Sequence, residues 1–161
     1  MSTKPTEQQQ AFIEEAGLFF EQAGWTRMAG RLLGWLLICD PPHQSSKELA
    51  AALQASKGSI SATTRMLEQV RLIERLSIPG ERRDYFRLRD DAWDQVMEGQ
   101  MHELAKLQAV AQRAAEQIAD ADDERRARVD DLLFMTDFLL REFPALLERW
   151  RAVRQERRTP D

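Results

Sequence analysis

The sequence predicts a mainly α fold with one small β-hairpin, on the evidence of three features. Apolar residues recur at spacings of three and four along most of the chain, which is the periodicity of amphipathic helices. Two short runs, residues 72–78 and 84–89, alternate in part between apolar and polar residues, as strands do. The 161 residues are 43% hydrophobic and 31% charged, so the chain can bury a core as one small domain with helical extensions.

Two helices are expected before residue 40. The first, over residues 6–23, has a wide apolar face that includes Phe19-Phe20 and must be covered by the protein's own core or by a second subunit. The second, over residues 26–38, is apolar nearly all round, which indicates a buried central helix. Gly30 and Gly34 each lower helix stability relative to alanine, so their presence four residues apart predicts the close approach of another helix.

Residues 45–69 predict two helices joined by a turn. Ser45 or Ser46 is expected to cap a short helix, with Glu48 near the capping-box position. Ser56 is expected to cap the helix that follows. With the two strands after it, this order of elements is that of a winged helix-turn-helix, which holds one helix against the major groove of DNA.

Small, hydroxylated and basic residues occupy one face of the helix expected over residues 57–69. At 100° per residue, Ile60, Thr64 and Leu67 fall on the opposite side. A helix in a DNA groove needs little bulk near its backbone, donors for phosphates and base edges, and a long cation. The wing, residues 78–84, carries two arginines suited to the DNA backbone or the minor groove. The residues expected to contact DNA are Ser45, Ser56, Lys57, Gly58, Ser59, Ser61, Ala62, Arg65, Arg82 and Arg83.

The net charge of the chain is −4, but its distribution is uneven. Residues 56–90 hold eight lysines and arginines against five aspartates and glutamates, a local charge of +3. A locally basic face on an acidic body can bind phosphates while the body resists indiscriminate association. Taken by itself, the charge distribution favours a solvated charge run over a nucleic-acid interface.

Two long helices are expected after the hairpin, over residues 91–119 and 123–157, with Pro144 kinking the second or dividing it. Apolar residues recur every seven positions in the first of them, as in a coiled-coil seam; these are Met97, Leu104, Ala111 and Ile118.

The helices at both ends carry more apolar surface than a lone DNA-binding module needs. We therefore expect a homodimer that binds two half-sites of double-stranded DNA, with a compact monomer as the alternative. The expected organisation is an N-terminal dimerisation helix (1–24), a winged helix-turn-helix DNA-binding domain (25–90) and a C-terminal helical dimerisation region (91–161).

Residues 24–37, GWTRMAGRLLGWLL, resemble the opening of GbsR-type members of the MarR superfamily. Residues 56–61, the Leu67-Glu68 pair and residues 80–86 are similar to that group's recognition helix and wing. The resemblance implies a homodimeric winged-helix transcriptional regulator, most often a repressor, whose terminal helices form the dimer interface and which takes a small effector near that interface. The chain departs from the pattern at Arg71, where many relatives have glycine.

An effector site, if present, is expected among aromatic and sulfur-containing side chains, because these suit apolar or quaternary-ammonium ligands. The candidates are Phe20, Trp25, Met28 and Trp35, for which plain core packing is the alternative. The one cysteine, Cys39, cannot form an intrachain disulfide; it is either a redox switch or, as is commoner for a buried thiol, a small hydrophobe.

Motifs for catalysis are missing from the sequence, which has two histidines in different elements and no HExxH, CxxC or phosphate-binding glycine loop. The acidic residues 120–124 lack EF-hand spacing, so no metal, cofactor or enzymatic activity is expected. No apolar run of eighteen residues and no secretory signal is found, which predicts a cytoplasmic protein without a membrane partner.

The alternative function is a winged-helix module that binds another protein and not DNA. A protein-binding face would carry more exposed aromatic residues than the small and basic residues expected here. The exposed face of the second helix of the helix-turn-helix therefore favours DNA.

Overall fold

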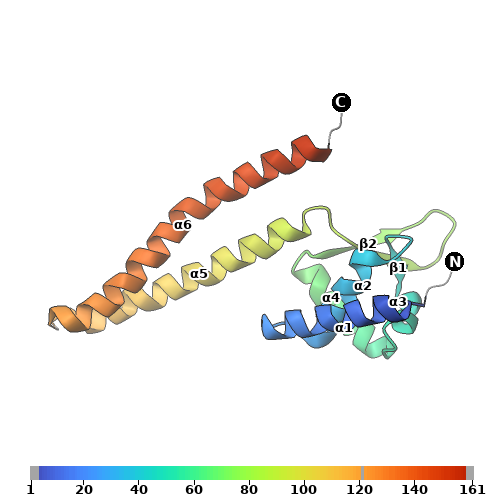
Figure 1. Ribbon diagram of the computed structural model, residues 1–161, viewed down its shortest axis with the longest axis horizontal. Helices are drawn as coiled ribbons and strands as arrows, with labels where there is room; N and C mark the ends of the chain where they lie inside the picture. The colour runs from blue at the N-terminus through green and yellow to red at the C-terminus, as the bar shows by residue number, and fades with distance from the viewer. Residues whose placement is uncertain (1–3, 121, 159–161) are drawn as a thin grey trace. The chain divides into compact units, whose positions relative to one another are not determined.

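The structure is a computed structural model that describes residues 4–120 and 122–158. Within these residues, six helices and three strands form two compact units, one ending at Gln95 and the other beginning at Val96. The elements (Figure 1) are α1 (Glu7–Gln22), α2 (Arg27–Ile38), β1 (Gln44–Ser45), α3 (Ser46–Ala52), α4 (Lys57–Gln69), β2 (Ile73–Ser77), β3 (Asp84–Leu88), α5 (Ala92–Gln117) and α6 (Asp123–Arg158). The predicted mainly α class is confirmed.

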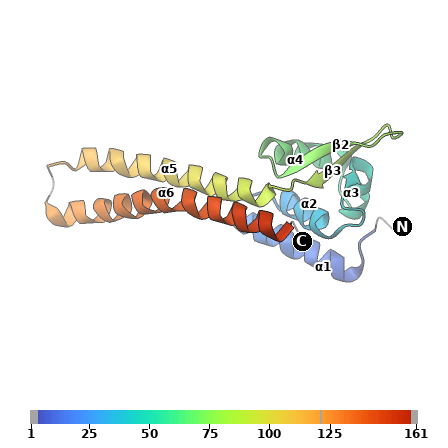
Figure 2. The ribbon, with the colours of Figure 1, turned by 90° about the horizontal axis from the view of Figure 1, so that it is seen from above.

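Helix α2 is the centre of the N-terminal unit. Leu32 and Leu33 are fully enclosed, and α1 packs against the same helix (Figure 2). A Cβ atom on Gly30 would lie 2.7 Å from the carbonyl oxygen of Ala16, and one on Gly34 would lie 2.7 Å from the Ala16 Cβ atom. The predicted close approach of another helix is thus confirmed, because the α1 backbone occupies the space that a side chain would fill.

Helices α3 and α4 form the helix-turn-helix, and both begin with serine caps. Ser45 caps α3 in a capping box: its Oγ accepts from Glu48 N at 3.3 Å, while Glu48 Oε2 accepts from Ser45 N at 2.7 Å. Ser56 caps α4 by accepting from Ser59 N at 3.1 Å. Between the helices, Gln54 has a φ of 50°, which places the turn in the left-handed region.

The sheet has three antiparallel strands in the order β1-β3-β2. In the wing, β2 and β3 pair from Ile73 with Leu88 to Ser77 with Asp84. Strand β1 pairs Gln44 with Phe86 and was not predicted from the sequence. A two-residue strand shows no alternation, and its partner lies far along the chain, so local patterns cannot detect it.

Arg71 lies in the turn between α4 and β2 with a φ of 60°. This left-handed conformation costs a residue with a Cβ atom about 1–2 kcal/mol. The turn is held by hydrogen bonds from Arg71 N to Glu68 O and from Leu72 N to Leu67 O, both 3.0 Å long. Arg71, which stands where many relatives are expected to have glycine, therefore has a backbone conformation that glycine adopts with less strain.

The C-terminal unit consists of α5, from Val96 onward, and α6, which run in opposite directions (Figures 1 and 2). Ala111 and Thr136 are buried, and Arg151 forms an ion pair with Glu98 across the two helices. Helix α6 continues through Pro144, so of the two outcomes expected there, division of the helix does not occur.

Many large apolar side chains of this unit remain exposed. They are Met97, Leu107, Val110, Phe134, Met135, Phe138, Leu146, Trp150 and Val153. Despite this apolar content, none of the helices in the described part of the chain combines the length and hydropathy that crossing a membrane requires.

Candidate nucleic-acid interface

Helix α4 has one buried side and one exposed side. Ile60 and Leu67 are fully buried, whereas Ser61, Ala62 and Arg65 are exposed. The hydroxyl of the buried Thr64 donates to Ile60 O at 2.9 Å, so it adds no unsatisfied polar group to the core. The exposed face of α4 therefore offers small side chains, hydroxyls and one long cation, which is what a DNA groove can accept. Ser56, Lys57 and Gly58 are exposed at its first turn, and Ser59 is half-buried.

A cleft of about 380 Å³ lies where the first turns of α3 and α4 meet the wing. Four residues expected to contact DNA line it, and the structure adds Ser46, Lys47 and Asp84; the full lining is Ser45, Ser46, Lys47, Lys57, Ser61, Arg83 and Asp84. Lys47 is the second residue of α3, and Lys57 is the first residue of α4. Folding of the helix-turn-helix thus brings two lysines ten positions apart in the sequence to one cleft.

The cations of the cleft are available to a ligand. Across residues 4–120 and 122–158, no salt bridge involves Lys47, Lys57 or Arg83. Arg65 and Arg82 likewise form none within the described chain. An anionic ligand would therefore displace no internal partner of these side chains.

Other arginines of residues 56–90 have internal partners. Arg75 pairs with Glu68 of α4 at 3.2 Å and with Asp84 of β3 at 3.2 Å, and the hydrogen bond to Glu68 raises its pKa. Arg87 pairs with Glu74 at 2.6 Å. Within residues 56–90, Arg75 and Arg87 thus form ion pairs in the wing, whereas Lys57 and Arg83 line the cleft and Arg65 lies on the exposed face of α4.

The wing is anchored to α4 through Arg75. Its guanidinium carbon also lies 5.5 Å from the centre of the Phe86 ring, a cation–π contact on β3. Gly80, with a φ of 86°, allows the hairpin to turn, and the exposed Arg82 and Arg83 follow it. The two wing arginines are therefore presented from a hairpin whose base is tied to the helix that carries Arg65.

Ser45 differs from the other residues expected to contact DNA. It is only 2% exposed, and its hydroxyl is engaged with Glu48 in the capping box. Ser45 thus contributes to the cleft through its position at the start of α3, while Ser46 and Lys47 carry the exposed side chains there. The sequence places these two residues at a helix start, but their position in the cleft depends on how α3 packs against α4 and the wing.

At the C-terminal edge of the sheet, Arg89 donates from Nε to Asp91 Oδ1 at 2.8 Å. This hydrogen bond lowers the pKa of the Asp91 carboxyl group. Together with the backbone bond from Arg89 N to Leu72 O at 3.0 Å, it holds the residues that directly follow β3.

The four candidates for effector binding lie on α1, α2 and the turn between them. Phe20 and Trp25 stack edge-to-face with ring centres 6.5 Å apart, and Met28 Sδ accepts from Arg31 Nη1 at 3.9 Å. Trp35 is buried, and its Nε1 has no hydrogen-bond partner in the described part of the chain. None of the four lines the cleft between α3, α4 and the wing.

Cys39 is a buried thiol at the end of α2. Desolvation raises its pKa from 9.0 to about 11, which keeps it protonated at neutral pH. Over residues 4–120 and 122–158, no three histidine, cysteine or acidic side chains are grouped closely enough to hold a metal ion.

Comparison with known proteins agrees with this geometry. The family model described as MmpR5-like MarR family transcriptional regulator matches residues 91–155. The transcriptional regulator MmpR5 of Mycobacterium tuberculosis is 47% identical over 121 residues, which are 75% of this chain and 73% of that protein. A crystal structure of a transcriptional regulator is 41% identical, with a TM-score of 0.74 over 90% of this chain and 99% of the other.

The helix-turn-helix, the wing and the cationic cleft define a DNA-binding transcriptional regulator of the winged-helix class. The chain belongs to the MmpR5-like MarR family. This family consists of transcriptional regulators and not of enzymes, which favours DNA over the alternative of a purely protein-binding module.

Proposed function

We propose that this protein is a homodimeric repressor that binds a pseudo-palindromic operator through α4 and the wing. The cleft that joins Lys47, Lys57 and Arg83 beside the exposed face of α4 carries this proposal. It combines a site for DNA phosphates with a helix slim enough to enter the major groove.

The two parts of the interface divide phosphate binding from sequence discrimination. Lys47 and Lys57 lie at the first turns of successive helices, and Arg83 lies on the wing. All three cations line the same cleft. A cleft lined by three cations suits the negatively charged sugar-phosphate backbone. Ser61 and Arg65 lie one turn apart on the exposed face of α4 and suit base edges, since arginine donates in bidentate fashion to guanine.

Dimer formation is supported by the apolar surface of the C-terminal unit. Phe134 is 70% exposed, and Phe138, Leu146 and Val153 are each about half exposed. Exposed patches of this kind on helices mark association surfaces. A second copy of the chain would cover them and place two α4 helices on one duplex, which is how a two-fold protein binds two half-sites.

Three finer points accompany the proposal. Release by a small-molecule effector at Phe20, Trp25, Met28 and Trp35 is favoured by the three aromatic rings among them and by the buried Trp35 Nε1, which has no hydrogen-bond partner within the described residues. The GbsR-type likeness of residues 24–37 remains a prediction, because the matching family model is the MmpR5-like one. A cytoplasmic location follows from operator binding.

Salt titration of duplex binding tests the proposal. We expect the full chain to bind duplex DNA with an affinity that falls as salt rises. Replacing Lys47, Lys57 or Arg83 by alanine weakens binding to all sequences and reduces the salt slope by about one each, while Arg65→Ala chiefly lowers discrimination between sequences. Lys106→Ala removes a cation already paired with Glu103 at 2.7 Å on α5 and serves as the control. Absence of duplex binding at low salt contradicts the proposal.

A further inference from the structure

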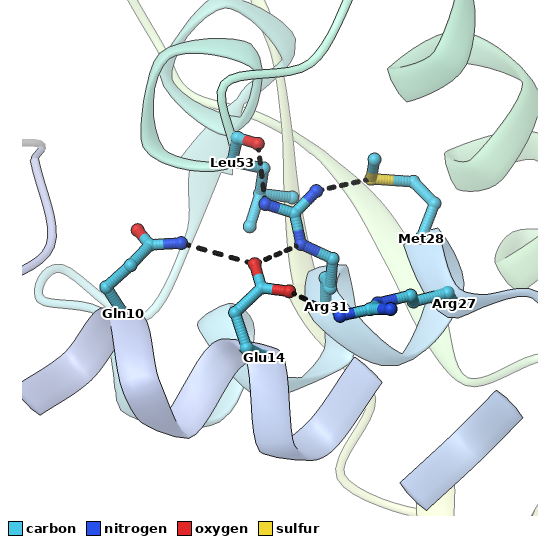
Figure 3. Close-up of polar contacts among 6 residues, drawn as sticks. All are labelled: Gln10, Glu14, Arg27, Met28, Arg31 and Leu53. Atoms are coloured by element: carbon cyan, nitrogen blue, oxygen red, sulfur yellow. Dashed lines mark hydrogen bonds and ion pairs between the residues drawn. The ribbon is translucent and has the colours of Figure 1, made fainter. Parts of the chain in front are cut away.

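Arg31, in the middle of α2, joins three elements of the N-terminal unit (Figure 3). Its Nε donates to Glu14 Oε1 of α1 at 2.8 Å, and its Nη2 donates to the carbonyl oxygen of Leu53, the C-cap residue of α3, at 2.9 Å. The side chain is only 16% exposed. A single guanidinium group therefore connects the N-terminal helix with the end of the first helix of the helix-turn-helix.

The carbonyl group that Arg31 holds lies at the turn that directs α4. Gln54, the next residue, has the left-handed φ of 50°, and Ala55 N donates to Ala50 O at 3.0 Å to close the turn. The last carbonyl groups of a helix have no partner within that helix. Arg31 supplies a partner for the carbonyl group of Leu53, which lies two residues before Ala55 and three before Ser56, the cap of α4.

On the other side, Arg31 is fixed by α1. Glu14 also accepts from Arg27 Nη2 at 3.2 Å and from Gln10 Nε2 at 3.4 Å, so its carboxylate is held from three directions. A Cβ atom on Gly17 would lie 2.7 Å from Arg31 Cγ, which shows that the aliphatic part of Arg31 packs directly on the α1 backbone. Movement of α1 along α2 would therefore move the Arg31 guanidinium.

We propose that Arg31 is a positioning residue for operator recognition, which links α1 to the orientation of α4 without contacting DNA. The inference rests on the proposed function, in which α4 binds the operator. Exposed apolar residues of α1, among them Phe19 and Leu18, give a partner subunit or a ligand a surface on which to act. Displacement of α1 is then transmitted through Glu14 and Arg31 to the turn after Leu53.

The chain offers matched variants. Arg31→Lys keeps the charge, but one ammonium group replaces the planar fork that reaches Glu14 and Leu53 together. Arg27→Lys changes an arginine of the same helix that bonds the same carboxylate but does not contact the turn. Glu14→Gln keeps an acceptor for Arg31 and removes the charge.

The test measures dissociation constants of the full chain for a selected operator and for an unrelated duplex. We expect Arg31→Lys to weaken operator binding about tenfold, in the range of mutations that act through coupling. Binding to the unrelated duplex and the salt slope should stay at their wild-type values, because no phosphate contact is lost. Hydrogen exchange at the Ala55 amide should become faster. Glu14→Gln should show a smaller loss, and Arg27→Lys none.

Equal operator affinity of Arg31→Lys and the wild type would overturn the inference. The inference would also fail if Arg31→Lys lost affinity equally for both duplexes and lowered the salt slope, because Arg31 would then be a phosphate contact. An equal loss of operator affinity in Arg27→Lys would contradict it as well, since that result would indicate general destabilisation of the α1–α2 pair. Failure of the wild type to bind any duplex would instead refute the proposed function itself. Thermal unfolding of each variant, followed by circular dichroism, shows that folded proteins are compared.

Discussion

The two units of the chain bury their apolar residues to very different extents. In the N-terminal unit, Leu32, Leu49, Leu53, Ile60 and Leu67 are fully enclosed by α1–α4 and the sheet. In the C-terminal unit, buried apolar residues are few, and phenylalanines and a tryptophan of α6 remain in contact with solvent. The N-terminal unit therefore has its own core, although Leu18 and Phe19 of α1 are exposed, whereas much of the apolar surface of the C-terminal unit is uncovered. This difference supports the proposal that DNA recognition and association lie mainly in different parts of the chain.

The largest effect on the stability of the well-packed N-terminal unit is expected from a substitution at the contact between α1 and α2. Gly30→Ala places a Cβ atom 2.7 Å from the Ala16 carbonyl oxygen, a backbone atom that cannot move without shifting α1. Overpacking of this kind costs about 1–3 kcal/mol, and we expect the upper end of that range in urea unfolding.

Gly99 of α5 is the control for this substitution. A Cβ atom there would meet nothing within 4 Å. Gly99→Ala should therefore raise the free energy of unfolding by up to about 1 kcal/mol, as alanine does in an open helix. Equal destabilisation by both substitutions would show that the close packing of α1 on α2 does not set the stability of the N-terminal unit.

Removing apolar side chains from α6 tests whether the exposed surface of the C-terminal unit mediates self-association. The double change Phe134→Ser, Phe138→Ser should weaken self-association by about 2 kcal/mol or more, because the transfer of each phenylalanine out of water is lost. Sedimentation equilibrium measures this effect. Thermal unfolding of the monomeric fraction should change little, since both side chains are exposed in the single chain. Unchanged association would mean that another surface joins the subunits.

A smaller effect is expected where a residue lies in the left-handed region. Arg71→Gly should stabilise the protein by about 1 kcal/mol, because glycine adopts the φ of 60° without steric strain. Denaturant unfolding gives the difference, with Arg71→Asn expected to lie between the two. Destabilisation by glycine would indicate that the Arg71 side chain, which interacts electrostatically with Asp91, outweighs the backbone strain.

The smallest effect concerns the Cys39 thiol. Burial raises its pKa from 9.0 to about 11, so at neutral pH its thiolate fraction is about a hundredfold lower than that of the unshifted group. Alkylation should be slow and should accelerate up to pH 11. Because the folded state favours the protonated thiol, its contribution to stability is present below pH 9 and is lost as the pH rises towards 11. Rapid alkylation at pH 7, or a peroxide response that Cys39→Ser abolishes, would support a redox switch instead.

Local patterns in the sequence were sufficient for the approximate bounds of the helices, for the Ser56 cap and for the wing. Ser56 as N-cap and the buried side of α4 follow from spacing alone, and Gly30 and Gly34 indicated a close helix contact. Strand β1 was not predicted because its pairing with β3 depends on tertiary structure. The same holds for Lys47 in the cleft and for the bond from Arg31 to the Leu53 carbonyl oxygen, which depend on how separate helices pack. Contacts between elements are the information that periodicity does not contain.

Selection of bound duplexes from a random pool by the full chain tests the central claim most directly. A dimer that presents two α4 helices should enrich two inverted half-sites whose centres lie about 34–36 Å apart, or at multiples of that spacing. Loss of enrichment in Arg65→Ala, with retained binding to unselected DNA, would tie the sequence preference to the exposed face of α4. Enrichment of a single half-site, or of no sequence at all, would contradict the account.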